Sequence, residues 1–308
     1  MLNNHCSRVS MLLSISLSLL LLIKSNFSIA QENQYYKDQD NNFHLIGHFK
    51  LSVLENDSTY SNWFVKGYQD FNVTLNKPSW IKQLSNVEVE IFLGTWCGDS
   101  KNWVPKFVKM WDELGLDRNK IQFTGLYDMI SGQSKYKQGP NGEEKNKNIH
   151  RVPTFIFKKN GQEISRIVEY PVNDLETDLA QIALGVPSKE NYKGASYMIN
   201  LFSQFKVAEI KANEWEHLYN VYRLVKGNPS ELNTYGYVLL ESGRIDEALL
   251  VFYFNSRYFP HDPNVYDSYG EALAKSGQIE KAIEMYEKVL LLDRSNVNAA
   301  TQLSKLRN

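Results

Sequence analysis

The sequence has few of the residues that usually carry redox or metal chemistry. It holds 2 cysteines and 6 histidines in 308 residues, so it lacks the disulfide framework of small secreted domains and any paired-cysteine or Cys–His zinc constellation. Neither sign of charge dominates, because 34 basic side chains are matched by 35 acidic ones. This balance argues against nucleic acid or an anionic membrane surface as the main partner. We therefore expect no metal, no cofactor and no nucleic-acid partner.

Long apolar runs are also scarce, and the one near the N-terminus is short. Met11–Ile23 follows Arg8 and precedes the small-residue ending Ser28-Ile29-Ala30. This order is typical of a secretory signal peptide, which we assign to residues 1–30. The run is shorter than the about 20 residues that a membrane span needs. We predict cleavage near Ala30, an exported protein that is periplasmic or secreted, and no membrane span after cleavage; an uncleaved anchor is the alternative.

Cleavage changes the cysteine count from two to one. Cys6 leaves with the signal peptide, and Cys97 is the single thiol of the mature chain. A lone thiol kept in an oxidising compartment needs an explanation.

Residues 31–187 carry the mixed pattern of an α/β domain with an N-terminal extension. The polar start, 31–42, predicts a loose segment. Aromatic and β-branched residues then predict strands separated by a turn, over Phe43–Leu54 and Trp63–Leu75. Val87–Leu93 places an apolar residue at every second position, which predicts a strand ending at Gly94. A helix is expected over 101–114.

The rest of this domain continues the alternation. We expect a strand over Ile121–Tyr127, a polar loop over 131–148 and a helix over 174–184. Val152–Phe157 and Ile164–Val168 predict a hairpin, because the Asn160-Gly161 pair between them supplies the positive φ angles of a tight turn. Strand, helix, strand, hairpin and helix together predict an α/β fold.

Residues 188–308 show continuous helical periodicity and an internal repeat. Pro229 and Pro263 open two segments that are 34 residues apart, and the same residue types recur inside them at that offset. The matched pairs are Tyr235-Gly236 with Tyr269-Gly270, Ser242-Gly243 with Ser276-Gly277, Ala248 with Ala282, and Phe252 with Tyr286. This period resembles the tetratricopeptide repeat, in which small residues let two helices cross closely. The second unit departs from the family pattern, since Arg294 stands where a closing proline is expected.

Helical segments flank the two clear repeats. Ala195–Lys226 reads as two helices of a degenerate unit, and Val297–Leu306 as a closing helix. Two interpretations of the helical domain stand equal: it packs against the first domain, or it offers a groove to a protein or peptide partner.

The motif with chemical potential is Trp96-Cys97-Gly98-Asp99-Ser100. A thiol between a strand and a helix lies where free backbone N–H groups and the helix dipole favour a thiolate. The motif, the helix proline Pro105, the tripeptide Val152-Pro153-Thr154 and the hairpin Gly161 together resemble thioredoxin-like proteins over residues 80–185. The resemblance implies a thioredoxin-like α/β fold in which a cis-proline tripeptide faces the thiol.

The departures from that family restrict the mechanism. Ser100 replaces the resolving cysteine, and Ile91 replaces a buried acid that would serve it. Asp99 opposes thiolate formation, whereas the helix dipole and Arg151 favour it. Glu169 replaces a glycine that lines the family's substrate groove.

Two functions follow from these residues. The first is a thiol-disulfide oxidoreductase or isomerase of monothiol type that acts on protein or peptide thiols and disulfides through a mixed disulfide at Cys97. The second is a non-catalytic module for protein or peptide binding, in which the fold and the repeats hold a partner. For the first, the catalytic residues are Cys97 and Ser100, and the substrate-binding residues are Trp96, Gly98, Asp99, Arg151, Val152, Pro153 and Thr154.

Overall fold

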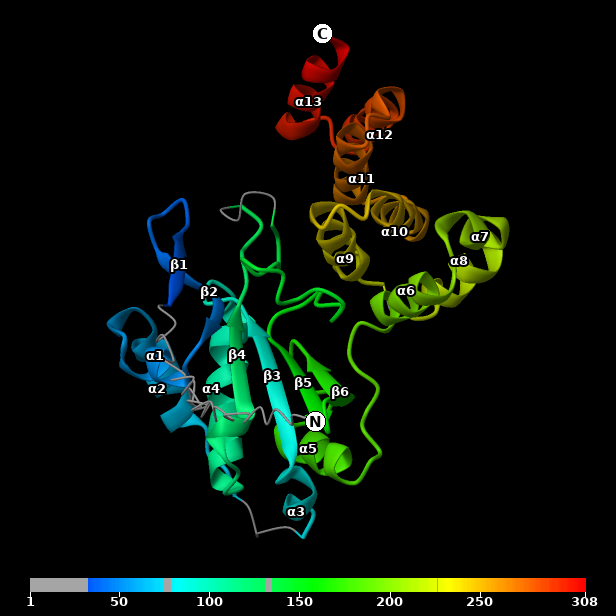
Figure 1. Ribbon diagram of the computed structural model, residues 1–308. Helices are drawn as coiled ribbons and strands as arrows, with labels where there is room; N and C mark the ends of the chain where they lie inside the picture. Colours follow the sequence, from blue (N-terminus) through cyan, green and yellow to red (C-terminus); the bar gives the residue numbers. More distant parts are fainter. Residues whose placement is uncertain (1–32, 75–78, 131–134, 226) are drawn as a thin grey trace, which may run out of the picture. The chain divides into compact units, whose positions relative to one another are not determined.

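The computed structural model describes residues 33–74, 79–130, 135–225 and 227–308 (Figure 1). The predicted signal peptide lies outside these ranges. By their contacts, residues 33–308 form one compact unit. An α/β region comes first along the chain and a helical region follows it.

The α/β region is built on a six-stranded sheet with the order β1-β2-β4-β3-β5-β6. β3 pairs in parallel with β4, and all other pairs are antiparallel. The strands are β1 (Gln34–Lys37), β2 (Phe43–Phe49), β3 (Val87–Leu93), β4 (Ile121–Gly125), β5 (Thr154–Lys159) and β6 (Gln162–Val168). The predicted strand at 87–93 and the predicted hairpin are confirmed, and Asn160 and Gly161 both have positive φ in the turn.

One face of the sheet carries the main hydrophobic core. Alternate residues of β3, among them Val89 and Ile91, pack there with the buried side chains of five helices. These helices are α1 (Leu51–Asn56), α2 (Ser58–Asp70), α3 (Ile81–Leu84), α4 (Gly98–Glu113) and α5 (Leu175–Ala183). α2 lies close against α4, because a Cβ at Gly67 would come within 2.8 Å of the Pro105 ring.

The opposite face of the sheet is covered by loop residues instead of a helix. Phe92 and Ile156 pack there against Leu126, Ile149 and Val152, and the side chains of Trp96 and Cys97 border this smaller cluster. The side chains of β3 divide between the two clusters because neighbouring residues of a strand point to opposite faces of the sheet. The segment after β4 therefore reaches the same side of the sheet as the thiol.

Three predictions for the start of this region are wrong. The predicted strand Phe43–Leu54 ends at Phe49, and residues 51–54 belong to helix α1. Residues 63–70 belong to helix α2, where Tyr60 and Phe64 are buried one turn apart and Asp57 accepts a hydrogen bond from the Thr59 N–H. Aromatic residues favour strands by propensity, but here they form the buried stripe of a helix. The predicted loose segment 31–42 contains β1, which pairs with β2.

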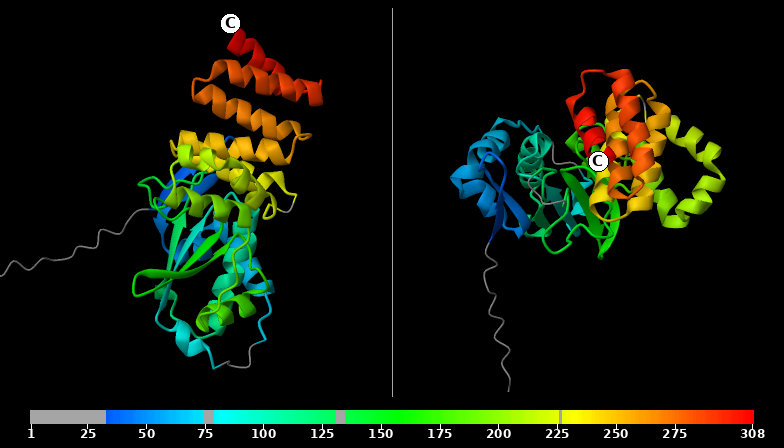
Figure 2. Two further views of the ribbon diagram at one scale, coloured as in Figure 1. Left: turned by 90° about the vertical axis from the view of Figure 1, so that its right-hand side faces the viewer. Right: turned by 90° about the horizontal axis from the view of Figure 1, so that it is seen from above.

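The helical region consists of eight helices among the described residues. They are α6 (Lys193–Gln204), α7 (Val207–Ala212), α8 (Glu214–Tyr222), α9 (Pro229–Glu241), α10 (Ile245–Tyr258), α11 (Pro263–Lys275), α12 (Ile279–Leu292) and α13 (Val297–Arg307). Figure 2 shows α9 to α12 as successive hairpin pairs. Ala195–Lys226 was predicted to form two helices, and its described residues, 195–225, form three, because the chain leaves the helix after Gln204 and again at Asn213.

The repeat seen in the sequence has a structural counterpart. α9 and α11 both begin with a proline behind a capping Asn228 or Asp262. Gly243 and Gly277 follow them with φ of 78° and 79°, a conformation that glycine adopts without steric cost. The predicted close crossings are also confirmed, since a Cβ at Gly236 would lie 2.7 Å from the Phe252 ring.

Candidate functional site at Cys97

Cys97 lies at the junction between the central strand and helix α4. It is the N-cap residue of α4, with extended backbone angles, and its carbonyl accepts the Lys101 N–H at 3.0 Å. Its side chain makes no capping hydrogen bond and instead donates from Sγ to the Val152 carbonyl at 3.2 Å. Cys97 is a partly exposed residue and is the free cysteine of the described residues. It therefore has both a defined position and access to solvent.

The residues after Cys97 divide into an exposed pair and a buried hydroxyl. Gly98 and Asp99 are exposed, and a Cβ at Gly98 would meet no atom within 4 Å. Ser100 is fully buried, and its Oγ accepts the Gly94 N–H at 3.2 Å. Ser100 thus fixes the turn that carries the thiol, while the surface beside Gly98 is open to an approaching molecule.

Trp96 forms one side of the site. Its indole N–H donates to the Leu126 carbonyl at 2.9 Å, and its ring lies 6.5 Å from the ring of Tyr136. Gly94 makes this position possible, since a Cβ there would collide with the indole at 2.4 Å. The indole is therefore held between the end of β4 and the loop that follows.

The tripeptide predicted to face the thiol does so through its first carbonyl. Val152, Pro153 and Thr154 are all buried, and the Val152–Pro153 peptide is cis. The Thr154 hydroxyl donates to the Arg151 carbonyl at 2.7 Å, so it stabilises the bend instead of facing solvent.

Arg151 is engaged with the helical region. Its guanidinium donates to the Ser230 carbonyl at 2.9 Å, lies 3.5 Å from the Glu169 carboxylate and packs 4.5 Å over the Tyr192 ring. Glu169 has a left-handed backbone, with φ of 66°, and its N–H donates to the Pro153 carbonyl. Burial raises the pKa of the Glu169 carboxyl, and the charge of Arg151 opposes that rise.

Sequence reasoning missed two residues of this site, Tyr136 and Lys137. They lie in the loop after β4, whose polar composition shows no period that could reveal burial. Lys137 is 4% exposed, and its ammonium donates to the His150 carbonyl at 2.8 Å. Burial, together with Arg151, lowers the pKa of Lys137 to about 7, against the opposing charges of Cys97 and Glu169. Burial raises the pKa of Tyr136 to about 12.

Three consecutive residues, His150 to Val152, connect the surroundings of the site. The His150 carbonyl holds Lys137, the Arg151 side chain holds the start of α9, and the Val152 carbonyl holds the thiol. The His150 ring is buried between Tyr192 and Tyr235, and burial lowers its pKa to about 3. This imidazole is therefore neutral at ordinary pH.

A second histidine, His44, contacts the turn that precedes Cys97. His44 on β2 contacts Asp38 through Nε2 at 3.0 Å and the Thr95 hydroxyl through Nδ1 at 3.3 Å. Thr95 also accepts the Leu45 N–H. In the described part of the chain, no group of three or more Cys, His, Asp or Glu side chains is placed to hold a metal ion. No helix there is both long and apolar enough to cross a membrane.

Comparison with known proteins identifies part of the helical region. A family model described as the tetratricopeptide repeat matches residues 263–296, which contain α11 and α12. No curated protein matches the chain. The chain thus carries an α/β region with a six-stranded sheet, followed by a helical region that includes a tetratricopeptide repeat.

Proposed function

We propose that the protein is an exported thiol-disulfide oxidoreductase of monothiol type with a thioredoxin-like α/β domain. The observation that carries the proposal is the contact between the Cys97 thiol and the Val152 carbonyl at the N-terminus of α4. It brings together the two motifs on which the resemblance rests, although they are more than 50 residues apart in sequence. The N-terminus of a helix, at a partly exposed cysteine, is also the environment in which thiolates are stabilised.

The proposed reaction needs an external thiol because Ser100 cannot resolve a disulfide. The Cys97 thiolate attacks one sulfur of a substrate disulfide, the substrate S–S bond breaks, and the other substrate sulfur leaves as a thiolate that takes up a proton. A second thiol, from a small molecule or a protein, then attacks the substrate sulfur of the mixed disulfide. That step forms a new disulfide outside the protein and releases the Cys97 thiolate.

The groups around the sulfur have assignable roles in this scheme. The open surface at Gly98 and Asp99 admits the substrate, and Trp96 bounds it. Val152, next to Pro153, offers backbone to an extended peptide. Ser100 and Thr154 position the chain through their hydrogen bonds to Gly94 and Arg151, so we assign them supporting roles.

The alternative function, a non-catalytic binding module, is favoured by a different observation. Tetratricopeptide repeats are stacks of helix pairs whose surfaces commonly bind proteins, and one such repeat matches α11 and α12. Arg151, predicted to bind substrate, is also occupied by contacts with Ser230, Glu169 and Tyr192. In this alternative Cys97 contributes only packing.

The deciding experiment measures the reactivity of the Cys97 sulfur. The full chain with Cys6→Ala carries one thiol, and its reaction with glutathione disulfide is followed by intact mass, native and in urea. Activation predicts that the native thiol reacts at least about tenfold faster than the same thiol in the unfolded chain. A native thiol that reacts more slowly than the unfolded one would leave the binding module as the function.

A second variant tests the missing resolving group. Ser100→Cys supplies a thiol three residues after Cys97, and we expect it to shorten the lifetime of the mixed disulfide by releasing glutathione without an added thiol. Ser100→Ala serves as the control, since it removes the same hydroxyl without adding sulfur. Equal lifetimes in the two variants would argue against a thioredoxin-like arrangement at this helix start.

Export is tested separately from chemistry. We expect the mature protein outside the cytoplasm to begin near Gln31, as read by N-terminal sequencing. A retained Met1 on the exported protein would identify the segment as an anchor.

A further inference from the structure

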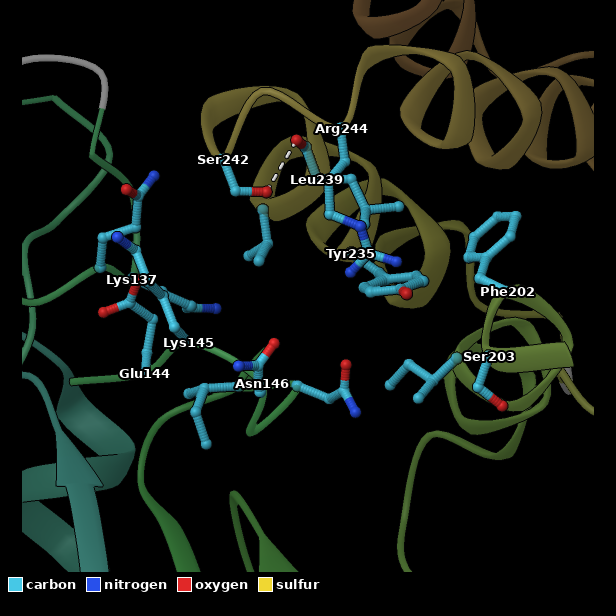
Figure 3. Close-up of a pocket in the computed structure, with 15 residues that line it drawn as sticks. Lys137, Glu144, Lys145, Asn146, Phe202, Ser203, Tyr235, Leu239, Ser242 and Arg244 are labelled. Atoms are coloured by element: carbon cyan, nitrogen blue, oxygen red, sulfur yellow. Dashed lines mark hydrogen bonds between the residues drawn. The ribbon is translucent and has the colours of Figure 1, made fainter. Parts of the chain in front are cut away.

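A cavity of about 510 Å³ lies apart from the open surface at Gly98, beside the loop that follows β4. One wall is the 137–149 part of that loop, and the others are α6 and the end of α9 with the turn after it. In Figure 3, Tyr235 and Arg244 face Glu144, Lys145 and Asn146 across the opening. Lys137 belongs to the surroundings of both Cys97 and this cavity, and the proposed thiol chemistry uses none of the other groups at this opening.

The lining of the cavity carries more positive than negative charge. Lys145 and Arg244 contribute two cations, Lys137 adds a third below its pKa of about 7, and Glu144 is the one carboxylate of the lining. Glu144 accepts the Gly139 N–H at 2.8 Å, and Arg244 is paired with Glu247 outside the cavity. A partly enclosed space with an excess of cations favours an anionic occupant.

A buried hydroxyl without a partner points to the same kind of ligand. Tyr235 is 2% exposed and lines the cavity, and its hydroxyl has no hydrogen-bond partner among the described residues. The guanidinium of Arg244 is the nearby group that favours the ionised form of this phenol. A buried O–H donor left unsatisfied is costly, so an acceptor that enters the cavity would gain by meeting it.

The remaining wall is apolar. Ile199 and Phe202 from α6 and Val238 and Leu239 from α9 complete the lining, together with Ile149 from the loop. A volume of about 510 Å³ is also within the range of organic ligand sites and far larger than a single inorganic anion requires. These surfaces would bury a carbon skeleton attached to the charged group.

We propose that this cavity binds a carboxylate ligand with an apolar body, whose carboxylate meets Arg244 and the Tyr235 hydroxyl, with Lys137 and Lys145 on the facing wall. The carboxylate comes either from a free organic acid or from an acidic side chain of a peptide that also carries an apolar residue. The site is independent of the redox proposal, because binding here needs no sulfur.

Binding is measured by calorimetry on the full chain with two probes, phenylacetate and the peptide acetyl-Glu-Phe-Glu-amide. We expect saturable binding of at least one probe in the millimolar range or tighter. Phenylacetate alone identifies a free acid as the source, and tighter binding of the peptide identifies a protein segment. Binding of neither probe at millimolar concentration would overturn the proposal.

The variant Tyr235→Phe separates a ligand-binding role from a structural one. It removes a hydroxyl that has no partner in the free protein, so we expect no loss of thermal stability but about tenfold weaker probe binding. Arg244→Gln should weaken binding to a similar extent, and Arg223→Gln, which changes an exposed arginine outside the cavity, should not. Equal affinities for wild type and Tyr235→Phe would contradict this assignment of the hydroxyl.

The pH dependence gives a further readout. Burial lowers the pKa of Lys137 to about 7, and the charges of Arg151, Cys97 and Glu169 act on it. The Tyr136 ring and His150 pack against it, and Arg244, Lys145 and Glu144 also line the cavity. The ammonium is charged below that pKa and neutral above it, so an anionic probe should bind more tightly one pH unit below it than one unit above. In Lys137→Met this difference should disappear; if it persists, the charge of Lys137 does not contribute to binding.

Discussion

At the scale of single residues, the site contains ionisable side chains whose burial costs folding free energy. Lys137 is a lysine removed from water with one carbonyl as its hydrogen-bond acceptor. Glu169 is a carboxylate on a left-handed backbone, next to Arg151. Burial of a charge is unfavourable unless a partner compensates for it. Both residues therefore make quantitative predictions about stability.

Lys137 should make the free energy of unfolding depend on pH. Its pKa is lowered to about 7 in the folded protein and returns to the ordinary lysine value of 10.5 on unfolding. Between these values the unfolded chain binds one more proton than the folded chain, so stability should rise by about 1.4 kcal/mol per pH unit as pH increases. Urea titrations at several pH values measure the slope.

The control for that slope is Lys137→Met, which cannot titrate. The unfolding free energy of wild type minus that of Lys137→Met should rise with pH above about 7 and be constant below it. Parallel curves over the whole range would mean that the Lys137 ammonium keeps an ordinary pKa.

Glu169 is tested by a matched pair of substitutions. Glu169→Gly and Glu169→Ala both remove the carboxylate near Arg151, but only glycine adopts a φ of 66° without steric cost. We expect the glycine variant to be more stable than the alanine variant by about 1–2 kcal/mol. Thermal and chemical unfolding of the two variants provide the comparison, and an alanine variant of equal stability would show that the backbone is relaxed there.

At the scale of secondary-structure elements, each close helix crossing depends on one glycine, which has no side chain to clash with the facing ring. Gly236 on α9 faces the ring of Phe252 on α10, and Gly270 on α11 faces the ring of Tyr286 on α12. The two crossings occupy equivalent places in the repeat but differ in tightness. A Cβ would lie 2.7 Å from Phe252 in the first and 3.2 Å from Tyr286 in the second.

This difference predicts an order of destabilisation. Gly236→Ala should cost about 1–3 kcal/mol because the ring must move, and Gly270→Ala should cost less. Part of each cost is offset, since alanine is the better helix former by about 1 kcal/mol. Circular dichroism during urea unfolding reports both values, and a larger loss for Gly270→Ala would reverse the assignment of the tighter crossing.

The elements that sequence reasoning predicted best are those with a clear period. Val87–Leu93 alternates because one side of β3 faces the helices and the other faces the loop, and the 34-residue offset reports paired helices. Helix α2 was missed because its aromatic residues favour a strand locally, whereas their burial follows a helical spacing. Propensity is a weak guide where tertiary packing decides.

The site was predictable only in part, for a related reason. Cys97 and Val152 belong to recognisable motifs, and they do meet. Lys137 and Tyr136 belong to a loop held by tertiary contacts, including the backbone hydrogen bonds between Tyr127 and residues 137 and 138. Such contacts produce no periodic pattern, so the burial of a lysine in a polar segment cannot be predicted from the sequence.

At the scale of the whole molecule, the two ends of α9 are attached to the α/β region. Arg151 donates to the Ser230 carbonyl at the start of the helix, and the Gln138 amide donates to the Glu241 carbonyl at its end. Aromatic contacts of His150 with Tyr192 and Tyr235 lie close by. These contacts couple the stability of the two regions.

The coupling predicts cooperative unfolding. Wild type should unfold in urea in one transition, whereas Arg151→Ala combined with Gln138→Ala should separate the helical region as an earlier transition. Hydrogen exchange resolves the two regions. Arg118→Ala is the control, because it breaks ion pairs to Glu55 and Asp112 within the α/β region and should lower stability without dividing the transition. Two transitions in wild type would mean that the contacts of α9 are too weak to couple the regions.

The three residues from His150 to Val152 contact three separate parts of the molecule. The His150 and Val152 carbonyls contact the Lys137 ammonium and the Cys97 thiol, and the Arg151 side chain between them contacts the start of α9. Because the three contacts come from adjacent residues, a change of backbone conformation at one of them should alter the other two. The same short stretch thus joins the helical region to the surroundings of the sulfur.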